Sequence, residues 1–213
     1  MCEIWLKCGQ ISALPRPDFG ANPSGIGNSK MLQPPDPFRL RPLSLSDLPA
    51  LSSIEQKSFP TPTKEKVYRY ELTENQLAHY QALTLKHENQ VERLLGFSGF
   101  WIIADELHIS TIAVDPRYRG LGLGELLLLN ILNLAYEHVA ALVTLEVREG
   151  NLIAQALYQK YAFEFVGRRV RYYRDTGKDA LLMTVNLKSN HQYPHFLQEK
   201  ENLLYSRLMG APL

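Results

Sequence analysis

The 213-residue sequence lacks the features that mark secreted, membrane-spanning or disulfide-bonded proteins. It has two cysteines, Cys2 and Cys8, without CxxC spacing, which indicates neither a disulfide framework nor a cysteine metal site. Its longest uncharged apolar stretches run about eleven residues, short of the roughly 20 that span a bilayer. The start of the sequence has no uninterrupted apolar signal segment. We therefore expect a cytoplasmic protein without a membrane segment or a metal.

The sequence also has almost no excess of positive or negative charge. The 23 lysines and arginines against 22 aspartates and glutamates leave a formal net charge of +1. No overall field then draws the chain to nucleic acid, so direct nucleic-acid binding is not expected. The 45% hydrophobic and 21% charged residues are ordinary values for a globular domain. We expect a monomer or a weak dimer.

Proline and glycine divide the chain into three parts. Residues 1–37 hold six of the 13 prolines and show no apolar period, so we expect a disordered arm. Residues 38–187 carry the patterns of one domain. Residues 188–213 form a tail with near-helical apolar spacing, which either docks as an extra helix or frays.

The apolar periods predict alternating strands and helices in one α/β domain. Helices are expected over 44–59, with Ser46 as the candidate cap, and over 61–73. The remaining segments follow the order ββββαβαββ, over 38–43, 77–85, 91–103, 107–114, 120–139, 140–147, 151–163, 164–174 and 179–187. This order predicts a sheet covered by helices on both faces.

Three glycines stand where the strand of residues 107–114 gives way to a helix: Gly120, Gly122 and Gly124. Without Cβ atoms they leave backbone N–H groups open at the positive end of the helix, which favours an anion such as a pyrophosphate. Arg119 would be the flanking cation. A P-loop is excluded because no Gly-Lys pair precedes Ser or Thr. A tight packing turn and dinucleotide binding stay open as alternatives.

Glu146 lies in the middle of a strand that is apolar on its other face. A buried, unpaired carboxylate is costly or has a raised pKa, which indicates a general base. The alternative is a structural pair with Arg148, two residues away on the same face. His108 is expected to be a solvated or packing residue outside the site.

The helix after this strand carries a polar stripe of Asn151, Gln155 and Tyr158. Asn151 would meet a ligand amide and Tyr158 would present a phenol; a helix cap and a packing residue are the alternatives. The opposite stripe, which includes Ile153, is expected to pack on the sheet.

The strand of residues 164–174 is rich in arginine and tyrosine. Alternation places Arg169, Arg171 and Tyr173 on one face and Tyr172 on the other. One face would line a peptide channel, or the strand is a charged, solvated edge.

Three segments carry a family resemblance: IAVDPRYRGLGLGELLL, TLEVREGNLIAQALYQKYAFEFVGRRVRYYRD and DALLMTVNL. They resemble the GNAT acetyltransferase superfamily, and within it the bacterial RimI-type peptide α-N-acetyltransferases, which acetylate the N-terminal alanine of a small-subunit ribosomal protein. Arg119, Gly122 and Gly124 fill the superfamily pattern [QR]xxGx[GA]. The resemblance covers roughly residues 38–187; it departs at Thr63, where relatives commonly carry tryptophan.

The resemblance implies a mixed, mostly antiparallel sheet of about seven strands, flanked by helices and splayed at an acetyl-CoA cleft. It implies Glu146 as base and Tyr158 as acid. We expect substrate contacts at Arg148, Tyr172 and Tyr173. The expected acetyl-CoA contacts are Ile112, Ala113, Val114, Arg119, Gly120, Leu121, Gly122, Leu123, Gly124, Glu125 and Asn151.

The implied reaction is direct acetyl transfer, within a ternary complex, to the N-terminal α-amine of a protein. Two alternatives are an acetyltransferase for a lysine or a small amine, and an acyl-CoA-binding module without catalysis.

Overall fold

The computed structural model describes residues 31–86 and 92–210. The two cysteines and most of the expected disordered arm lie outside these residues. The described end of the arm, residues 31–37, contains no helix or strand. Met31 and Leu32 nevertheless pack against the core, so this end of the arm belongs to the folded body.

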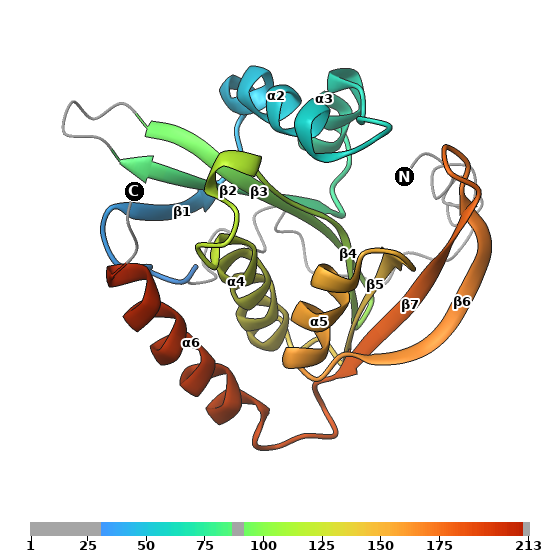
Figure 1. The fold of residues 1–213 in the computed structure, drawn as a ribbon. Helices are drawn as coiled ribbons and strands as arrows, with labels where there is room; N and C mark the ends of the chain where they lie inside the picture. The colour runs from blue at the N-terminus through green and yellow to red at the C-terminus, as the bar shows by residue number, and fades with distance from the viewer. Residues whose placement is uncertain (1–30, 87–91, 211–213) are drawn as a thin grey trace.

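The described residues form a seven-stranded sheet in the order β1-β2-β3-β4-β5-β7-β6 (Figure 1). Among its neighbouring strands β4 and β5 are the one parallel pair, which confirms the predicted mixed, mostly antiparallel sheet. The strands are β1 (Phe38–Pro42), β2 (Ala78–Lys86), β3 (Glu92–Ile103), β4 (Glu106–Val114), β5 (Leu142–Arg148), β6 (Glu164–Tyr173) and β7 (Lys178–Asn186).

Helices cover both faces of the sheet (Figure 1). The helical elements are η2 (Leu45–Asp47), α2 (Leu48–Ser58), α3 (Glu65–Thr73), η3 (Pro116–Tyr118), α4 (Leu123–Glu137), α5 (Leu152–Lys160) and α6 (Tyr193–Met209). One cluster of buried apolar side chains lies under α2 and α3, and a larger one joins the sheet to α4 and α6. None of the helices in the described residues has the length and apolar character needed to cross a bilayer.

The parallel strands β4 and β5 stay paired for only part of their length. Their register runs from Glu106 opposite Leu142 to Ile109 opposite Leu145. Just beyond Ile109, the register between β3 and β4 shifts, so that Ser110 is an extra residue in β4. Such a bulge bends its strand. The last residues of β4 therefore turn away from β5 and leave a split in the sheet.

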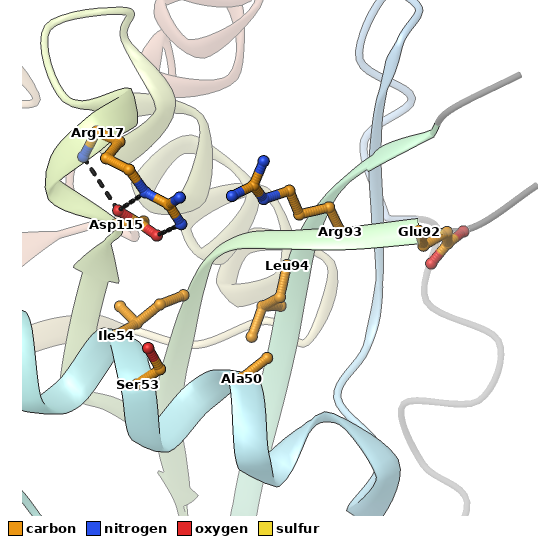
Figure 2. Close-up of a pocket in the computed structure, with 8 residues that line it drawn as sticks. All are labelled: Ala50, Ser53, Ile54, Glu92, Arg93, Leu94, Asp115 and Arg117. Carbon is orange, nitrogen blue, oxygen red and sulfur yellow. Dashed lines mark hydrogen bonds and ion pairs between the residues drawn. The ribbon is translucent and has the colours of Figure 1, made fainter.

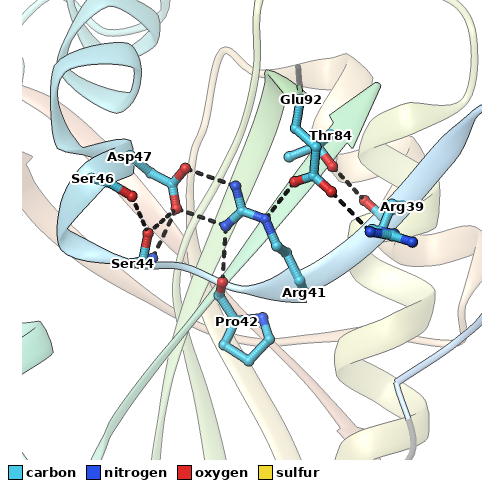
Figure 3. Close-up of polar contacts among 8 residues, drawn as sticks. All are labelled: Arg39, Arg41, Pro42, Ser44, Ser46, Asp47, Thr84 and Glu92. Carbon is cyan, nitrogen blue, oxygen red and sulfur yellow. Dashed lines mark hydrogen bonds and ion pairs between the residues drawn. The ribbon is translucent and has the colours of Figure 1, made fainter. Parts of the chain in front are cut away.

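The helical segment that begins with η2 and continues as α2 is fixed by Arg41, Ser44 and Asp47 rather than by the predicted cap Ser46. Ser44 and Asp47 form a capping box, and both ends of the Arg41 guanidinium reach Asp47 at 2.7 and 2.8 Å (Figure 3). Arg41 also reaches Glu92 at 2.7 Å. Burial acts to raise the pKa of Asp47, but the bonds from Arg41 and Ser44 lower it to about 2.

The tail beyond residue 187 docks as helix α6 instead of fraying. Leu197, Leu204 and Leu208 are buried against the core, and the hydroxyl group of Tyr193 donates to the carbonyl oxygen of Tyr161 at 2.9 Å. Burial of apolar side chains supplies most of the free energy that holds such a helix in place.

A buried amide connects the arm, α4 and the sheet, and it provides a test of this packing. Asn130 in α4 accepts a hydrogen bond from the backbone N–H of Leu32 at 2.8 Å and donates one to Gln81 at 2.8 Å. We predict that Asn130→Ala lowers the free energy of unfolding by about 1–3 kcal/mol, because both partners lose a bond inside the protein. Urea denaturation measures this change.

Asn133→Ala is the matched control on the same helix. The amide of Asn133 donates to the carbonyl oxygen of Leu129, one turn earlier, at 3.0 Å. Its replacement should change the free energy of unfolding by less than about 0.5 kcal/mol. Equal losses in the two variants would contradict a special role for the Asn130 bridge.

Candidate active site

The glycine turn leads into the first turn of α4, as the sequence predicts. Gly120 and Gly122 adopt positive φ angles of 84° and 89°, which glycine tolerates best. Within the described residues, and apart from its chain neighbours, no heavy atom lies within 4 Å of where a Cβ of Gly120 would stand. In the described part of the chain no side chain caps α4, whose first hydrogen bond joins Leu126 N–H to Gly122 O at 3.0 Å. The preceding amides therefore lack helical acceptors and suit an anion.

Arg119, next to the glycine turn, forms hydrogen bonds with two other segments. Its Nε donates to the carbonyl oxygen of Val114 at 3.1 Å, and its guanidinium reaches Ser58 Oγ at 2.9 Å. This joins the end of β4 to the end of α2. The expected flanking cation is thus held by two protein oxygens, and its other guanidinium N–H groups remain able to donate to an anion.

Glu125, another expected contact, uses its side chain to bind residues outside the turn. Its carboxylate bonds to Lys160, to the Tyr161 hydroxyl group at 2.9 Å and to Arg207 at 2.7 Å. Only the backbone N–H of Glu125 is then left for the predicted anion. The apolar side chains of Leu121 and Leu123 likewise leave only backbone groups for that role.

The split between β4 and β5 leads directly into the glycine turn. The β5-facing edge of residues 112–114 has no strand partner in the described pairing, while β3 holds the other edge as far as Val114. An exposed strand edge offers a row of N–H and C=O groups. Together with the turn it forms a backbone track suited to an extended polar ligand that ends in an anion.

Glu146 stands at the edge of this split, and its predicted place in the strand agrees with the structure. The side chain is 5% exposed; Oε2 lies 2.8 Å from Nε2 of His108, and Oε1 lies 2.9 Å from the Arg169 guanidinium. Burial acts to raise the pKa of Glu146, but the contact with His108 and the nearby Arg169 charge outweigh it, so that the pKa is lowered. The expectation of a raised pKa is therefore wrong, and so is the pairing with Arg148.

His108 is a site residue that the sequence reasoning placed outside. It packs face to face on Trp101, with ring centroids 5.7 Å apart, and Trp101 Nε1 donates to Glu71 at 2.8 Å. This stack fixes the imidazole beside Glu146. The only feature of the sequence that could have indicated this contact was a histidine in β4, the strand next to the one that carries Glu146.

Arg148 instead organises the hairpin of β6 and β7. It pairs with Asp175 at 2.7 Å, and its guanidinium lies 3.8 Å from the ring centre of Tyr173. Asp175 also accepts from Thr61, in the loop between α2 and α3, at 3.1 Å. The hairpin and that loop are thus joined beside the split.

A register shift between Arg169 and Tyr173 interrupts the predicted alternation of β6. Arg171 has a φ angle of 50°, and its N–H donates to Asp179 at 2.8 Å. As a result Arg169, which contacts Glu146, also lies over the Tyr172 ring at 5.6 Å. The assignment of Arg169 and Tyr172 to opposite faces is therefore wrong.

Helix α5 presents its predicted polar stripe. Asn151 caps the helix by accepting from Ala154 N–H at 3.3 Å, and Gln155 donates to the carbonyl oxygen of Arg148 at 3.1 Å. Burial, and to a smaller extent Tyr173, raise the pKa of Tyr158, so its phenol keeps its proton at neutral pH. Ile153 is 87% exposed, which contradicts its expected packing on the sheet.

Glu55 is a second residue that the sequence reasoning missed. It is fully buried, accepts from the Tyr68 hydroxyl group and from Thr63 N–H at 2.9 Å. Burial raises its pKa. Glu55 thereby fixes the loop that Thr61 joins to the hairpin.

A separate hollow of about 420 Å³ lies between α2, the start of β3 and η3. Figure 2 shows that Arg117 there turns back onto Asp115, which it meets at 2.6 Å. Arg117 and Glu92 in its lining are paired with protein groups, and none of the predicted site residues lines it. In residues 31–86 and 92–210, no three His, Cys, Asp or Glu side chains form a group able to hold a metal ion.

Comparison with known proteins identifies relatives of the chain. A model described as the acetyltransferase (GNAT) family matches residues 48–163, more than half of the chain. A putative ribosomal protein bS18-alanine N-acetyltransferase of Bacillus subtilis is 38% identical over 70% of this chain and 95% of its own length. The ribosomal protein bS18-alanine N-acetyltransferase of Escherichia coli is 33% identical over 67% of this chain and 93% of its own length.

Solved structures agree with the fold. The ribosomal-protein-S18-alanine N-acetyltransferase from Escherichia coli has a TM-score of 0.62 and 30% identity, and the match covers 70% of this chain and 94% of that one. Arabidopsis thaliana NAA60, solved in complex with acetyl-CoA, has a TM-score of 0.63 at 19% identity, over 71% of this chain and 99% of that one. The latter likeness concerns the fold.

The position of His108 leads to a prediction about Glu146. His108→Gln removes the imidazole that lies 2.8 Å from Oε2 of Glu146, so burial weighs more heavily and the pKa of Glu146 should rise. A carbon-13 titration of the glutamate carboxyl groups followed by nuclear magnetic resonance measures this change.

His195→Gln provides the control, because His195 is an exposed residue of α6 that pairs with Glu199. That variant should leave the Glu146 titration unchanged. An unaltered or lowered pKa in His108→Gln would show that the imidazole does not stabilise the carboxylate.

Proposed function

The chain belongs to the GNAT acetyltransferase family, and from this we propose that it transfers an acetyl group from acetyl-CoA to the N-terminal α-amine of a protein. The proposed substrate is the N-terminal alanine of a small-subunit ribosomal protein, in line with the relatives' names. One observation carries the proposal: the open edge of β4 leads to the glycine turn, and the Glu146–His108 pair stands beside it. A ribosomal substrate is consistent with a cytoplasmic location.

The backbone track fits acetyl-CoA. The turn at Gly120 and Gly122 would hold the diphosphate with its free amides, and the open edge of residues 112–114 would pair with the amide groups of the pantetheine arm. Asn151 would contact the same arm from α5. When bound, acetyl-CoA supplies a thioester, an acyl group already activated for attack by an amine.

Glu146 would take the proton that the substrate amine must lose. An α-ammonium group has a pKa of about 7.7–8.0, against about 10.4 for lysine, so less free energy is needed to deprotonate it. Glu146 is ionised at neutral pH because its pKa is lowered. With His108 on one oxygen and Arg169 on the other, we propose that it accepts the proton through a water molecule or together with the imidazole.

Two further groups of the chain would complete the reaction. A backbone N–H near Val114 would donate to the acetyl carbonyl oxygen as negative charge develops there. The hydroxyl group of Tyr158, kept protonated by burial, would give its proton to the departing sulfur. The amine would attack directly, without an acetylated form of the protein.

The substrate peptide would lie between the hairpin and the loop that follows α2. Thr61, Asp175 and Arg148 join these two parts, and Tyr172 and Tyr173 provide aromatic surface beside Glu146. This placement gives Arg148 a positioning role and leaves the two tyrosines to contact the peptide backbone.

We predict that Glu146→Gln lowers kcat with an N-terminal alanine peptide by about 10²- to 10⁴-fold, because the proton acceptor is lost. The dissociation constant for acetyl-CoA should be nearly unchanged. Glu149→Gln is the control, since Glu149 is an exposed neighbour paired with Arg168, and it should retain its activity. Full activity of Glu146→Gln would remove Glu146 from the mechanism.

A panel of acceptors tests the substrate class. It contains peptides that begin with alanine or with other residues, N-terminally blocked peptides with an internal lysine, and polyamines. We expect acetylation of free N-termini, with alanine preferred. Faster acetylation of blocked peptides or polyamines would contradict the proposal, and binding of acetyl-CoA without any acetylation would indicate a non-catalytic module.

A further inference from the structure

Helix α6 lies against the glycine turn although it begins well after residue 163, where the family match ends. It runs antiparallel to α4, so that its last turn lies beside the first turn of α4 (Figure 1). Leu204 Cδ1 would stand 3.0 Å from a Cβ of Gly122. The turn thus fits under α6 because Gly122 has no side chain.

A carboxylate stands beside the amides that the proposed diphosphate requires. Glu125 is the third residue of α4, and a glutamate at this position commonly reaches back to accept from the backbone N–H at the start of its helix. Burial acts to raise the pKa of Glu125, but hydrogen bonds from Lys160, Arg207 and Tyr161 lower it. Glu125 is therefore an anion at neutral pH, and it is able to compete with a phosphate for the same donors.

Two cations keep this carboxylate away from the turn. Lys160, at the end of α5, binds Oε1, which also accepts from Tyr161. Arg207, in the last turn of α6, binds Oε2 at 2.7 Å. The partial negative charge at the end of α6 lies near the same place, and Arg207 offsets it as well.

We propose that α6, through Arg207, restrains the Glu125 carboxylate so that it does not occupy the anion site of the glycine turn. Arg207 is a positioning residue that sets the affinity for the diphosphate of CoA, and Lys160 shares this role. The inference rests on the proposed function, because it assumes that the diphosphate binds at this turn.

The test measures CoA binding by titration calorimetry, without any peptide. Arg207→Met keeps the apolar stem of the side chain and removes its charge. It should weaken CoA binding by about threefold to tenfold, the size expected for a charge at a helix terminus. Arg207→Lys should restore most of the affinity. A thermal melt of each variant shows whether α6 still packs.

A Glu125→Ala variant distinguishes two explanations for a loss of affinity: release of the Glu125 carboxylate, or loss of a direct contact between Arg207 and CoA. In Glu125→Ala the competing carboxylate is absent, so adding Arg207→Met should change the affinity by less than about twofold. S-acetylpantetheine, which has no diphosphate, gives a further comparison. Its kcat/KM as acetyl donor should be the same for wild type and Arg207→Met, whereas that for acetyl-CoA falls.

Each outcome decides the inference. Equal CoA affinity of wild type and Arg207→Met would overturn it while leaving the proposed function intact. An equal loss in the Glu125→Ala background, or with S-acetylpantetheine, would also overturn it, because restraint of Glu125 would not be the cause. A wild-type protein that binds no CoA at all would overturn both proposals.

Discussion

The candidate site depends on the point at which β4 and β5 separate. A parallel pair that continued to the end of both strands would use the backbone groups of β4 for sheet hydrogen bonds. Instead pairing ends at Ile109 and Leu145, where the bulge at Ser110 bends β4. Because β3 and β7 hold the outer edges of these strands, the sheet opens at this place without losing either strand. The free edge and the adjacent glycine turn both follow from this separation.

The split also explains why polar side chains are retained in the middle of a sheet. His108 lies on the paired part of β4 and Glu146 just beyond the paired part of β5. They meet at 2.8 Å beside the opening. A buried carboxylate is tolerated when partners offset its loss of hydration. Here the partners come from two other strands, so the charge of Glu146 is tied to the assembled sheet.

Local patterns in the sequence were sufficient for the strands, for the helices before residue 164 and for the glycine turn, but they left the tail that forms α6 undecided. Alternation placed Glu146 on the correct face of β5, and the glycines of residues 120–124 indicated the open amides. What the sequence could not show was which side chains meet across strands. The His108 contact depends on the register of a parallel pair, and the Asp175 partner of Arg148 comes from a hairpin turn. The bulge in β6 likewise broke an alternation that local reasoning assumes.

The same physical balance governs two carboxylates with opposite roles. For both Glu146 and Glu125, burial favours the neutral acid, and side chains from distant segments reverse that preference. These partners differ in where they lie. Those of Glu146 leave it beside the opening of the sheet, where a substrate amine would arrive. Those of Glu125 come from α5 and α6 and draw it away from the turn. The direction of the restraint, rather than the charge itself, determines whether each carboxylate serves the site or would obstruct it.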